Sequence, residues 1–226
     1  MHLNILLSLT LFALVIQANC LQSSADYNFL DGIVKKAANK VSKAIENNPN
    51  AYRPLFMGQQ LLYIPDANSK YGLKLLIWNG KADGLSSFQG ENGNHIVGFG
   101  NYSKILVGFK FNKLSFTFNF GMAYRLLPPG YLQFIANDIH FDCSVKVESY
   151  SPLVLGEFLI ANGTNVGEME LFLNGESYKE KSDLNFEPVL KYYAQKMSDY
   201  ARETLSEYSY YLVEQLQEQL SDLPRS

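Results

Sequence analysis

Apolar and polar side chains alternate with a period of two through most of the middle of this 226-residue chain. Successive side chains of a β-strand point to opposite faces, so each alternating row predicts a strand with one covered face and one solvated face. The rows are Ile105–Phe111, Leu114–Tyr124, Ile139–Val147 and Met169–Leu173. Turn sequences separate the rows: Pro128-Pro129-Gly130, Asn162-Gly163 and Asn174-Gly175. We therefore expect residues 71–176, approximately, to form a long and strongly twisted antiparallel sheet.

A helical period precedes this region. A helix that begins at Ser24 or Asp26 and ends at Asn47-Asn48-Pro49 would present one apolar stripe. The stripe consists of Phe29, Leu30, Ile33, Val34, Ala37, Val41, Ala44 and Ile45. Residues 49–70 are an irregular connection that can add a short strand at 61–64.

A second helical period ends the chain. Asp183 or Asn185 can cap this helix, and Pro188 suits its first turn, where no intrahelical hydrogen bond is lost. The apolar stripe continues from Val189 to Leu220, which predicts one helix of roughly 33 residues, about 50 Å long. The expected fold class is α+β: a long curved antiparallel sheet wrapped around an N-terminal helix and a long C-terminal helix.

The first twenty residues have the pattern of a secretory signal. Ile5–Ile16 is an apolar run, too short to span a bilayer comfortably, and Ala18 and Cys20 suit cleavage before Leu21. We expect residues 1–20 to be a signal peptide, residues 21–226 to form a single domain, and the mature protein to be secreted and extracellular. Removal of Cys20 would leave Cys143 without an intramolecular disulfide partner.

Charge and motifs exclude several functions. The net charge of −3 argues against nucleic-acid binding. The chain contains no G-x-S-x-G nucleophile motif, so we expect no enzyme, and it indicates no cofactor. His95 and His140 lack the spacing of zinc ligands, and Asp138, His140 and Asp142 are better interpreted as the solvated face of one strand than as a metal site.

Aromatic residues are unusually abundant, with 15 Phe and 15 Tyr. On the inward faces they form either solid core or the wall of an elongated apolar pocket. The candidate ligand-binding residues are Phe109, Phe111, Phe116, Phe118, Phe120, Tyr124, Tyr193, Met197 and Tyr200. Gln195, Ser198 and Tyr208 are polar positions on the same helix that could orient a head group. The sequons at Asn101 and Asn162 are candidate glycosylation sites.

Three segments carry a resemblance to a known family: DYNFLDGIVKKAANKVSKAIE at 26–46, LIWNGKADGLSSF at 76–88 and the helix that starts with NFEPVL at 185–190. In this order they resemble the single-module members of the tubular lipid-binding superfamily. The chain is most similar to mite group 7 allergens, and next to insect juvenile-hormone-binding and takeout-like proteins. Those insect proteins carry a cysteine pair near the mature N-terminus, which this chain lacks.

The resemblance implies a hydrophobic channel between sheet and helices. We therefore expect a secreted protein that sequesters or carries a lipid- or terpenoid-like ligand, with no stable membrane insertion. The alternative is a secreted interaction protein without a cargo, either allergen-like or recognising microbial lipid. A secreted hydrolase is disfavoured by the missing nucleophile motif.

Overall fold

The fold comes from a computed structural model of the full chain. It describes residues 24–48, 59–65, 72–99, 102–122, 129–150, 153–177 and 185–221. The expected signal peptide, Cys20, Asn101, Tyr124 and the cap candidate Asp183 lie outside the described residues.

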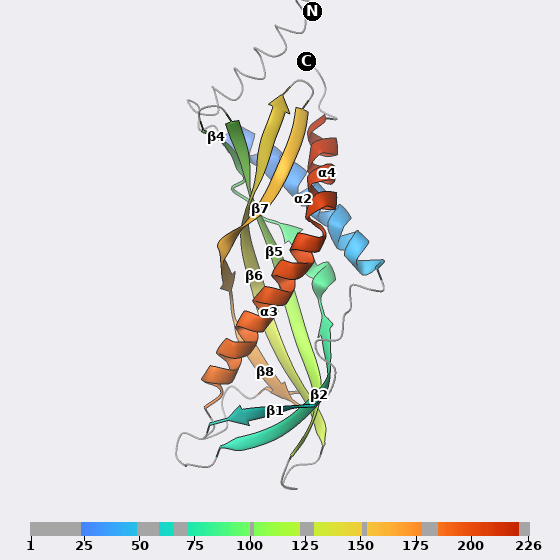
Figure 1. The fold of residues 1–226 in the computed structure, drawn as a ribbon, viewed down its shortest axis with the longest axis vertical. Coiled ribbons are helices and arrows are strands. Elements are labelled where there is room, and N and C mark those ends of the chain that lie inside the picture. Colours follow the sequence, from blue (N-terminus) through green and yellow to red (C-terminus); the bar gives the residue numbers. More distant parts are fainter. Residues whose placement is uncertain are drawn as a thin grey trace, which may run out of the picture.

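The expected α+β class is confirmed: one long antiparallel sheet is covered by an N-terminal helix and by a C-terminal pair of helices (Figure 1). The helices are α2 (Ser24–Glu46), α3 (Glu187–Glu207) and α4 (Ser209–Ser221), with a 3-10 turn η2 (Leu85–Ser87). The strands are β1 (Gln59–Ile64), β2 (Leu73–Asp83), β3 (Phe88–Gly90), β4 (His95–Phe99), β5 (Tyr102–Met122), β6 (Gly130–Tyr150), β7 (Leu153–Val166), β8 (Met169–Leu173) and β9 (Glu176–Ser177). The short strand expected at 61–64 is β1.

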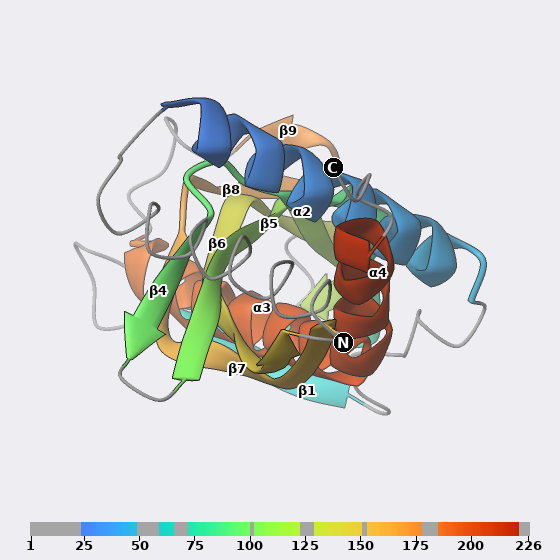
Figure 2. The same ribbon diagram turned by 90° about the horizontal axis from the view of Figure 1, so that it is seen from above.

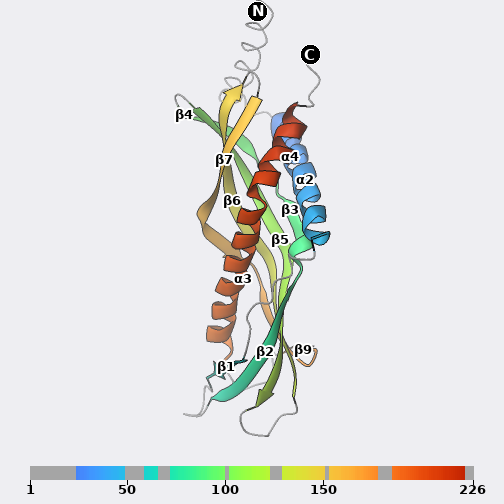
Figure 3. The same ribbon diagram turned by 45° about the vertical axis from the view of Figure 1, so that its right-hand side comes forward.

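The sheet is built on β5 and β6, which have 21 residues each and pair along nearly their whole length. At about 3.4 Å per residue these strands are about 70 Å long, which gives the molecule its elongated shape (Figure 3). The main strand order is β1-β2-β5-β6-β8-β9; β3 and β4 also pair with β5, and β7 pairs with β6.

Two rows that the sequence presents separately belong to the same strand. In β5 the positions in the core are odd up to Phe111 and even from Leu114 onward. In β6 they are even up to Ala136 and odd from Ile139 onward. Ser115 and Ile135 are buried outside this core. Asp138 has a positive φ of 52° at this point, so the strand leaves the extended conformation and the inward positions shift by one. We call residues 103–111 and 139–147 the upper half of the strand pair, and residues 114–120 and 132–136 the lower half.

The helices cover the two halves differently. α3 contacts β5, β6, β7 and β8, whereas α2 packs mainly on β3 and η2, and α4 packs mainly on β7. α2 and α4 also pack on each other, so that helices and strands surround a common axis when the molecule is seen from above (Figure 2). We call the contact between α2 and α4 the helix seam.

α2 forms as expected, with one correction. Its apolar stripe is buried from Leu30 to Ile45 except for the half-buried Ala44, but Phe29 is 49% exposed and so does not belong to the buried face. The helix approaches β3 so closely that a Cβ atom on Gly90 would lie 2.9 Å from Val34 Cγ1. Glycine at position 90 therefore permits this contact.

The sequence predicts one continuous C-terminal helix, and this is wrong in one respect. The helix is interrupted by a bend at Tyr208, which separates α3 from α4. Tyr208 still donates its N–H to Thr204 O (3.1 Å) and accepts from Leu212 N (2.9 Å). Thr204 Oγ1 donates to Tyr200 O (3.0 Å), a side-chain bond to the preceding turn that bends helices. At the start of α3, Asn185 Oδ1 accepts from Glu187 N (3.1 Å), although the cap position itself is Phe186.

Of two turns expected from the sequence, Asn174-Gly175 is confirmed and Asn162-Gly163 is wrong. Asn174-Gly175 is a tight turn between β8 and β9, with φ values of 51° and 86°, as a two-residue hairpin requires. Asn162-Gly163 is not a turn: it lies within β7, between the pairs Cys143–Ile160 and Phe141–Thr164, where the register shifts. The extra residues are accommodated as a bulge, a position that suits glycine.

Candidate ligand-binding site

Aromatic side chains from the sheet and from α3 meet in the lower half. Phe134 stacks on Tyr193 with ring centroids 3.9 Å apart and an interplanar angle of 16°. Phe118 contacts both of these rings, at 6.2 and 5.5 Å. Phe116 contacts Phe118 at 6.5 Å and Tyr200 at 5.6 Å, in both cases edge to face. These distances are those of packed aromatic pairs, so α3 lies directly on the sheet here.

A second aromatic group lies in the upper half, next to the point where the inward positions shift. Phe88 of β3 packs on Phe109 and Phe111, each at 5.2 Å, and Phe111 contacts Phe141 at 6.1 Å. Phe158 of β7 lies 6.4 Å from Phe109. The predicted residues are thus divided between two groups of rings instead of forming one continuous row.

All predicted ligand-binding residues that the structure describes are in the interior. Phe109, Phe111, Phe116, Phe118, Phe120, Tyr193 and Met197 are buried, and Tyr200 is half-buried against the core. Their contact with a ligand stays a prediction.

Two central rings, Phe88 and Phe134, are absent from the predicted set. The alternation Leu132, Phe134, Ala136 is visible in the sequence, but its phase is opposite to that of Ile139–Val147 in the same strand. Phe88 belongs to a strand of three residues, too short to show a period.

Beyond the two aromatic groups, the inward side chains at the end of the upper half are aliphatic. They are Ile105, Val107, Val145, Val147 and Leu155, each no more than 6% exposed. α4 adds Leu212 and Leu216, which are fully covered. Since α2 and α4 pack mainly on the flanking strands β3 and β7, this apolar surface lies beneath the helix seam.

Polar contacts hold the helix seam at both ends. Asn48 Nδ2 donates to Tyr208 Oη (2.9 Å), and Lys40 Nζ pairs with Glu218 Oε2 (2.7 Å). The second pair is exposed, and exposed ion pairs contribute about 0–1 kcal/mol. The seam is therefore held mainly by its apolar contacts.

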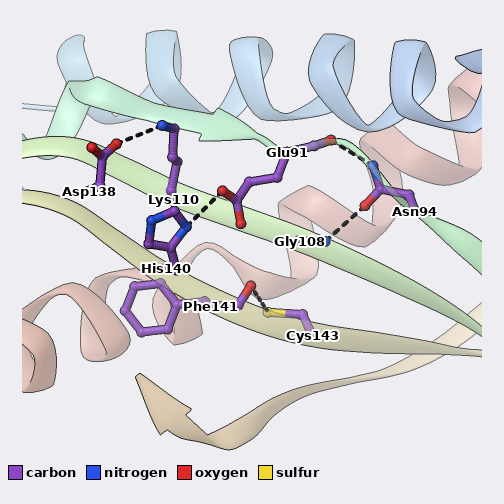
Figure 4. Close-up of polar contacts among 8 residues, drawn as sticks. All are labelled: Glu91, Asn94, Gly108, Lys110, Asp138, His140, Phe141 and Cys143. Carbon is purple, nitrogen blue, oxygen red and sulfur yellow. Dashed lines mark hydrogen bonds and ion pairs between the residues drawn. The ribbon is translucent and has the colours of Figure 1, made fainter. Parts of the chain in front are cut away.

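A buried polar anchor fixes α2 to the sheet. Asn94 Nδ2 donates to Asp31 Oδ1 (2.7 Å) and to Glu91 O (2.7 Å), while Asn94 Oδ1 accepts from Gly108 N (2.8 Å). Asn94 N also donates to Asp31 Oδ1 (2.9 Å). Figure 4 shows the hydrogen bonds of Asn94 with Glu91 and Gly108. It joins α2, β5 and the segment between β3 and β4.

The strand face with Asp138, His140 and Asp142 is polar and partly exposed, as expected. Lys110 pairs with Asp138 (2.6 Å), and His140 Nδ1 lies 2.7 Å from Glu91 Oε1 (Figure 4). The Lys110 ammonium, by its hydrogen bond and its charge, holds the pKa of Asp138 below its ordinary value.

An open groove of about 480 Å³ lies on this face, lined by His140, Asp142, Ala161, Gly163, Thr164 and Asn165. Nearby, Arg202 donates to Ala161 O and to Thr164 Oγ1, at 3.0 Å each. Among the described residues, no three His, Cys, Asp or Glu side chains are grouped so that they could hold a metal ion.

The three polar head-group candidates differ in position. Gln195 is exposed and donates to Asp199 Oδ1 (2.8 Å), Tyr208 accepts from Asn48 in the helix seam, and Ser198 is buried. Burial raises the pKa of the Tyr193 hydroxyl far above its ordinary value, so Tyr193 is neutral at any physiological pH.

Cys143 is a free cysteine on the inward face of β6, 4% exposed. Burial raises the pKa of its thiol to about 12. Because the thiolate is the reactive form, this thiol is inert in the folded chain.

The chain was compared with known proteins. No family model matches it, and no curated protein matches it. The crystal structure of Epiphyas postvittana Takeout 1 is similar at 14% identity over 83% of this chain and 88% of that chain, with a TM-score of 0.32. A TM-score this low carries no conclusion about function, and the resemblance to mite group 7 allergens stays a prediction. Within the described residues, no helix is both long enough and apolar enough to cross a membrane.

Proposed function

We propose that this chain is a secreted protein that binds an apolar, lipid- or terpenoid-like ligand between its sheet and its helices and catalyses no reaction. The observation that carries the proposal is the aliphatic surface beneath the helix seam. There, apart from the buried Ser103, the long strands present apolar side chains inward, and the two covering helices pack mainly on the elements at either side. The ring contacts of the lower half close the other end of this interior.

Burial of the ligand supplies the binding energy. An alkyl chain gains about 0.8 kcal/mol for each methylene removed from water, before the costs of ordering are subtracted. The flat rings of Phe109 and Phe111 border the aliphatic surface and would pack against the far end of such a chain. No covalent chemistry is needed for this role.

The ligand enters where the helices separate. The interior side chains near the helix seam are covered, so α4 has to move away from α2 before a ligand reaches them. The exposed Lys40–Glu218 pair resists this motion little, and Asn48–Tyr208 is one further hydrogen bond. In this proposal α4 pivots at Tyr208, where α3 ends, while α3 stays on the sheet.

One experiment tests the binding function directly. The purified protein is extracted with organic solvent for mass spectrometry, and the extracted protein is then titrated with an anilinonaphthalene dye. We expect a co-purified apolar compound and saturable dye binding. Val107→Phe, which enlarges a side chain of the aliphatic surface beneath the helix seam, should weaken dye binding, whereas Tyr210→Ala on the exposed face of α4 should not. No extracted lipid together with no saturable dye binding would end the proposal.

Secretion is tested separately by mass analysis of the protein released from a eukaryotic host. We expect the secreted chain to begin at Leu21 and to carry glycans at Asn101 and Asn162, both removable by a peptide glycosidase. Retention of residues 1–20 on the released protein would contradict the expected cleavage.

A further inference from the structure

One buried polar atom near the helix seam has no partner within the described part of the chain. Gln215 of α4 is 7% exposed, and its Oε1 atom is shielded from solvent without accepting a hydrogen bond. Folded proteins contain few such atoms, and each costs about 1–3 kcal/mol of folding free energy. A leucine would avoid this cost.

Three other polar side chains in or next to α4 have partners. Gln217 Oε1, two residues further along, accepts from Leu155 N of β7 (3.2 Å). Tyr208 and Glu218, on the side of α4 that faces α2, bond to Asn48 and Lys40. The unpaired oxygen of Gln215 differs in this from the side chains of Gln217, Tyr208 and Glu218.

The helical spacing places Gln215 between the helix seam and the apolar interior. It lies seven residues after Tyr208, which bonds to Asn48 just beyond the end of α2, and three before Glu218, which bonds to Lys40 of α2. Leu212 and Leu216, three residues before it and one after, are fully buried. Residues three, four and seven apart share a helix face, so the amide lies at the edge of the aliphatic surface described above.

We infer that Gln215 Oε1 accepts a hydrogen bond from the head group of the bound ligand. This inference rests on the proposed function and defines its ligand class: a neutral amphiphile with an apolar chain and a hydroxyl at one end. The hydroxyl supplies the donor that the buried oxygen lacks, while the chain lies on the aliphatic side chains of β5, β6 and β7. Ethers and esters of the same length offer no donor, and an ionised carboxylate would meet an oxygen in place of a donor.

The test uses two probes that differ in this donor: tetradecanol and its methyl ether, each competing against the anilinonaphthalene dye. We expect the parent protein to bind the alcohol about three- to tenfold more tightly than the ether, the effect of one net hydrogen bond. Gln215→Leu should remove this preference by weakening only alcohol binding. Gln60→Leu, a matched change at an exposed glutamine on β1, should keep the preference.

The outcomes separate the two proposals. If neither probe displaces the dye and the dye does not bind, the binding function is wrong, and this inference fails with it. If both probes bind the parent equally, the binding function stands and the role of Gln215 is wrong. A preference that survives Gln215→Leu would also overturn the role of Gln215.

Stability gives an independent readout. Without ligand, Gln215→Leu should melt at the same temperature as the parent or higher, because an unpaired buried acceptor is removed. Gln215→Met, an unbranched side chain of similar length, serves if the leucine variant does not fold. Loss of the alcohol preference in the methionine variant, with unchanged ether binding, supports the inference, and its retention refutes it.

Discussion

The anchor between α2 and the sheet is a sharp test of the structure, and Asn94→Ala removes it. Asn94 is 2% exposed, and its side chain joins three elements through Asp31, Glu91 and Gly108. The alanine keeps the backbone N–H that donates to Asp31, but it loses three side-chain hydrogen bonds. It also leaves Gly108 N without that acceptor.

The expected loss follows from these bonds. The bonds to Glu91 O and from Gly108 N are between neutral groups and contribute about 1 kcal/mol each, whereas the bond to the Asp31 carboxylate contributes about 1.5–3 kcal/mol. Asn94→Ala should therefore lower the free energy of unfolding by about 3–5 kcal/mol. This is a large part of the total stability of an ordinary domain, about 5–15 kcal/mol.

Urea unfolding followed by circular dichroism measures this loss, with the slope m checked for constancy. Asn92→Ala is the matched control in the same segment, because Asn92 is exposed and its Oδ1 only accepts from Lys35 Nζ. The control should change stability by less than about 0.5 kcal/mol. A loss below about 1.5 kcal/mol for Asn94→Ala would show that the anchor does not hold α2 in place.

Three further predictions concern the helices and the sheet. Leu205→Asp, at a buried position of α3, should unfold or strongly destabilise the chain because it buries an unpaired charge. The control Glu203→Lys, at an exposed position of the same helix, should leave the melting temperature nearly unchanged. Equal melting temperatures for Leu205→Asp and the parent would show that Leu205 does not lie on the buried face of α3. Phe118→Ala should cost about 3–5 kcal/mol in urea unfolding because three rings pack on Phe118, and a loss below about 1.5 kcal/mol would instead indicate the wall of an open pocket. Lys110 lowers the pKa of Asp138 in the folded chain, so the stabilisation of the fold by this ion pair is complete above the unfolded pKa of about 3.9 and is lost as the pH falls through the lower folded pKa. The urea midpoints of the parent and Lys110→Met should therefore differ slightly at neutral pH and converge in acid. A difference that persists in acid would exclude this ion pair as its source.

The period of the side chains predicts the elements of this fold well but not how they join. Alternation reports burial on one face, and it identified the strand segments in β5 and β6 because those faces are covered. It could not join them into two 21-residue strands, because the phase changes at the positive φ of Asp138, which periodicity alone does not show. For the same reason Phe134, out of phase with the rest of its strand, was absent from the predicted site.

The candidate site was predictable only in part. Burial of the predicted aromatic side chains follows from their positions in alternating rows and in a helix stripe. Their pairing depends on contacts between residues far apart in the chain, such as Phe88 with Phe109 and Phe134 with Tyr193. Gln215 had a local signal, a polar residue between the apolar positions Leu212 and Leu216, but only the structure shows that its oxygen has no partner.

The shift at Asp138 also explains how one strand pair serves two purposes. A sheet about 70 Å long twists substantially, so a single unbroken face could not stay directed at the helices along its whole length. Shifting the inward positions by one at mid-strand lets the lower half present rings to α3, while the end of the upper half, beyond its own aromatic group, presents aliphatic side chains beneath α2 and α4. Interlocked rings resist separation, whereas an alkyl chain can replace aliphatic contacts with equivalent ones at little cost. The proposed ligand therefore belongs at this end of the upper half, and in the proposed entry step the packed lower half would keep the sheet and α3 together while α4 moves.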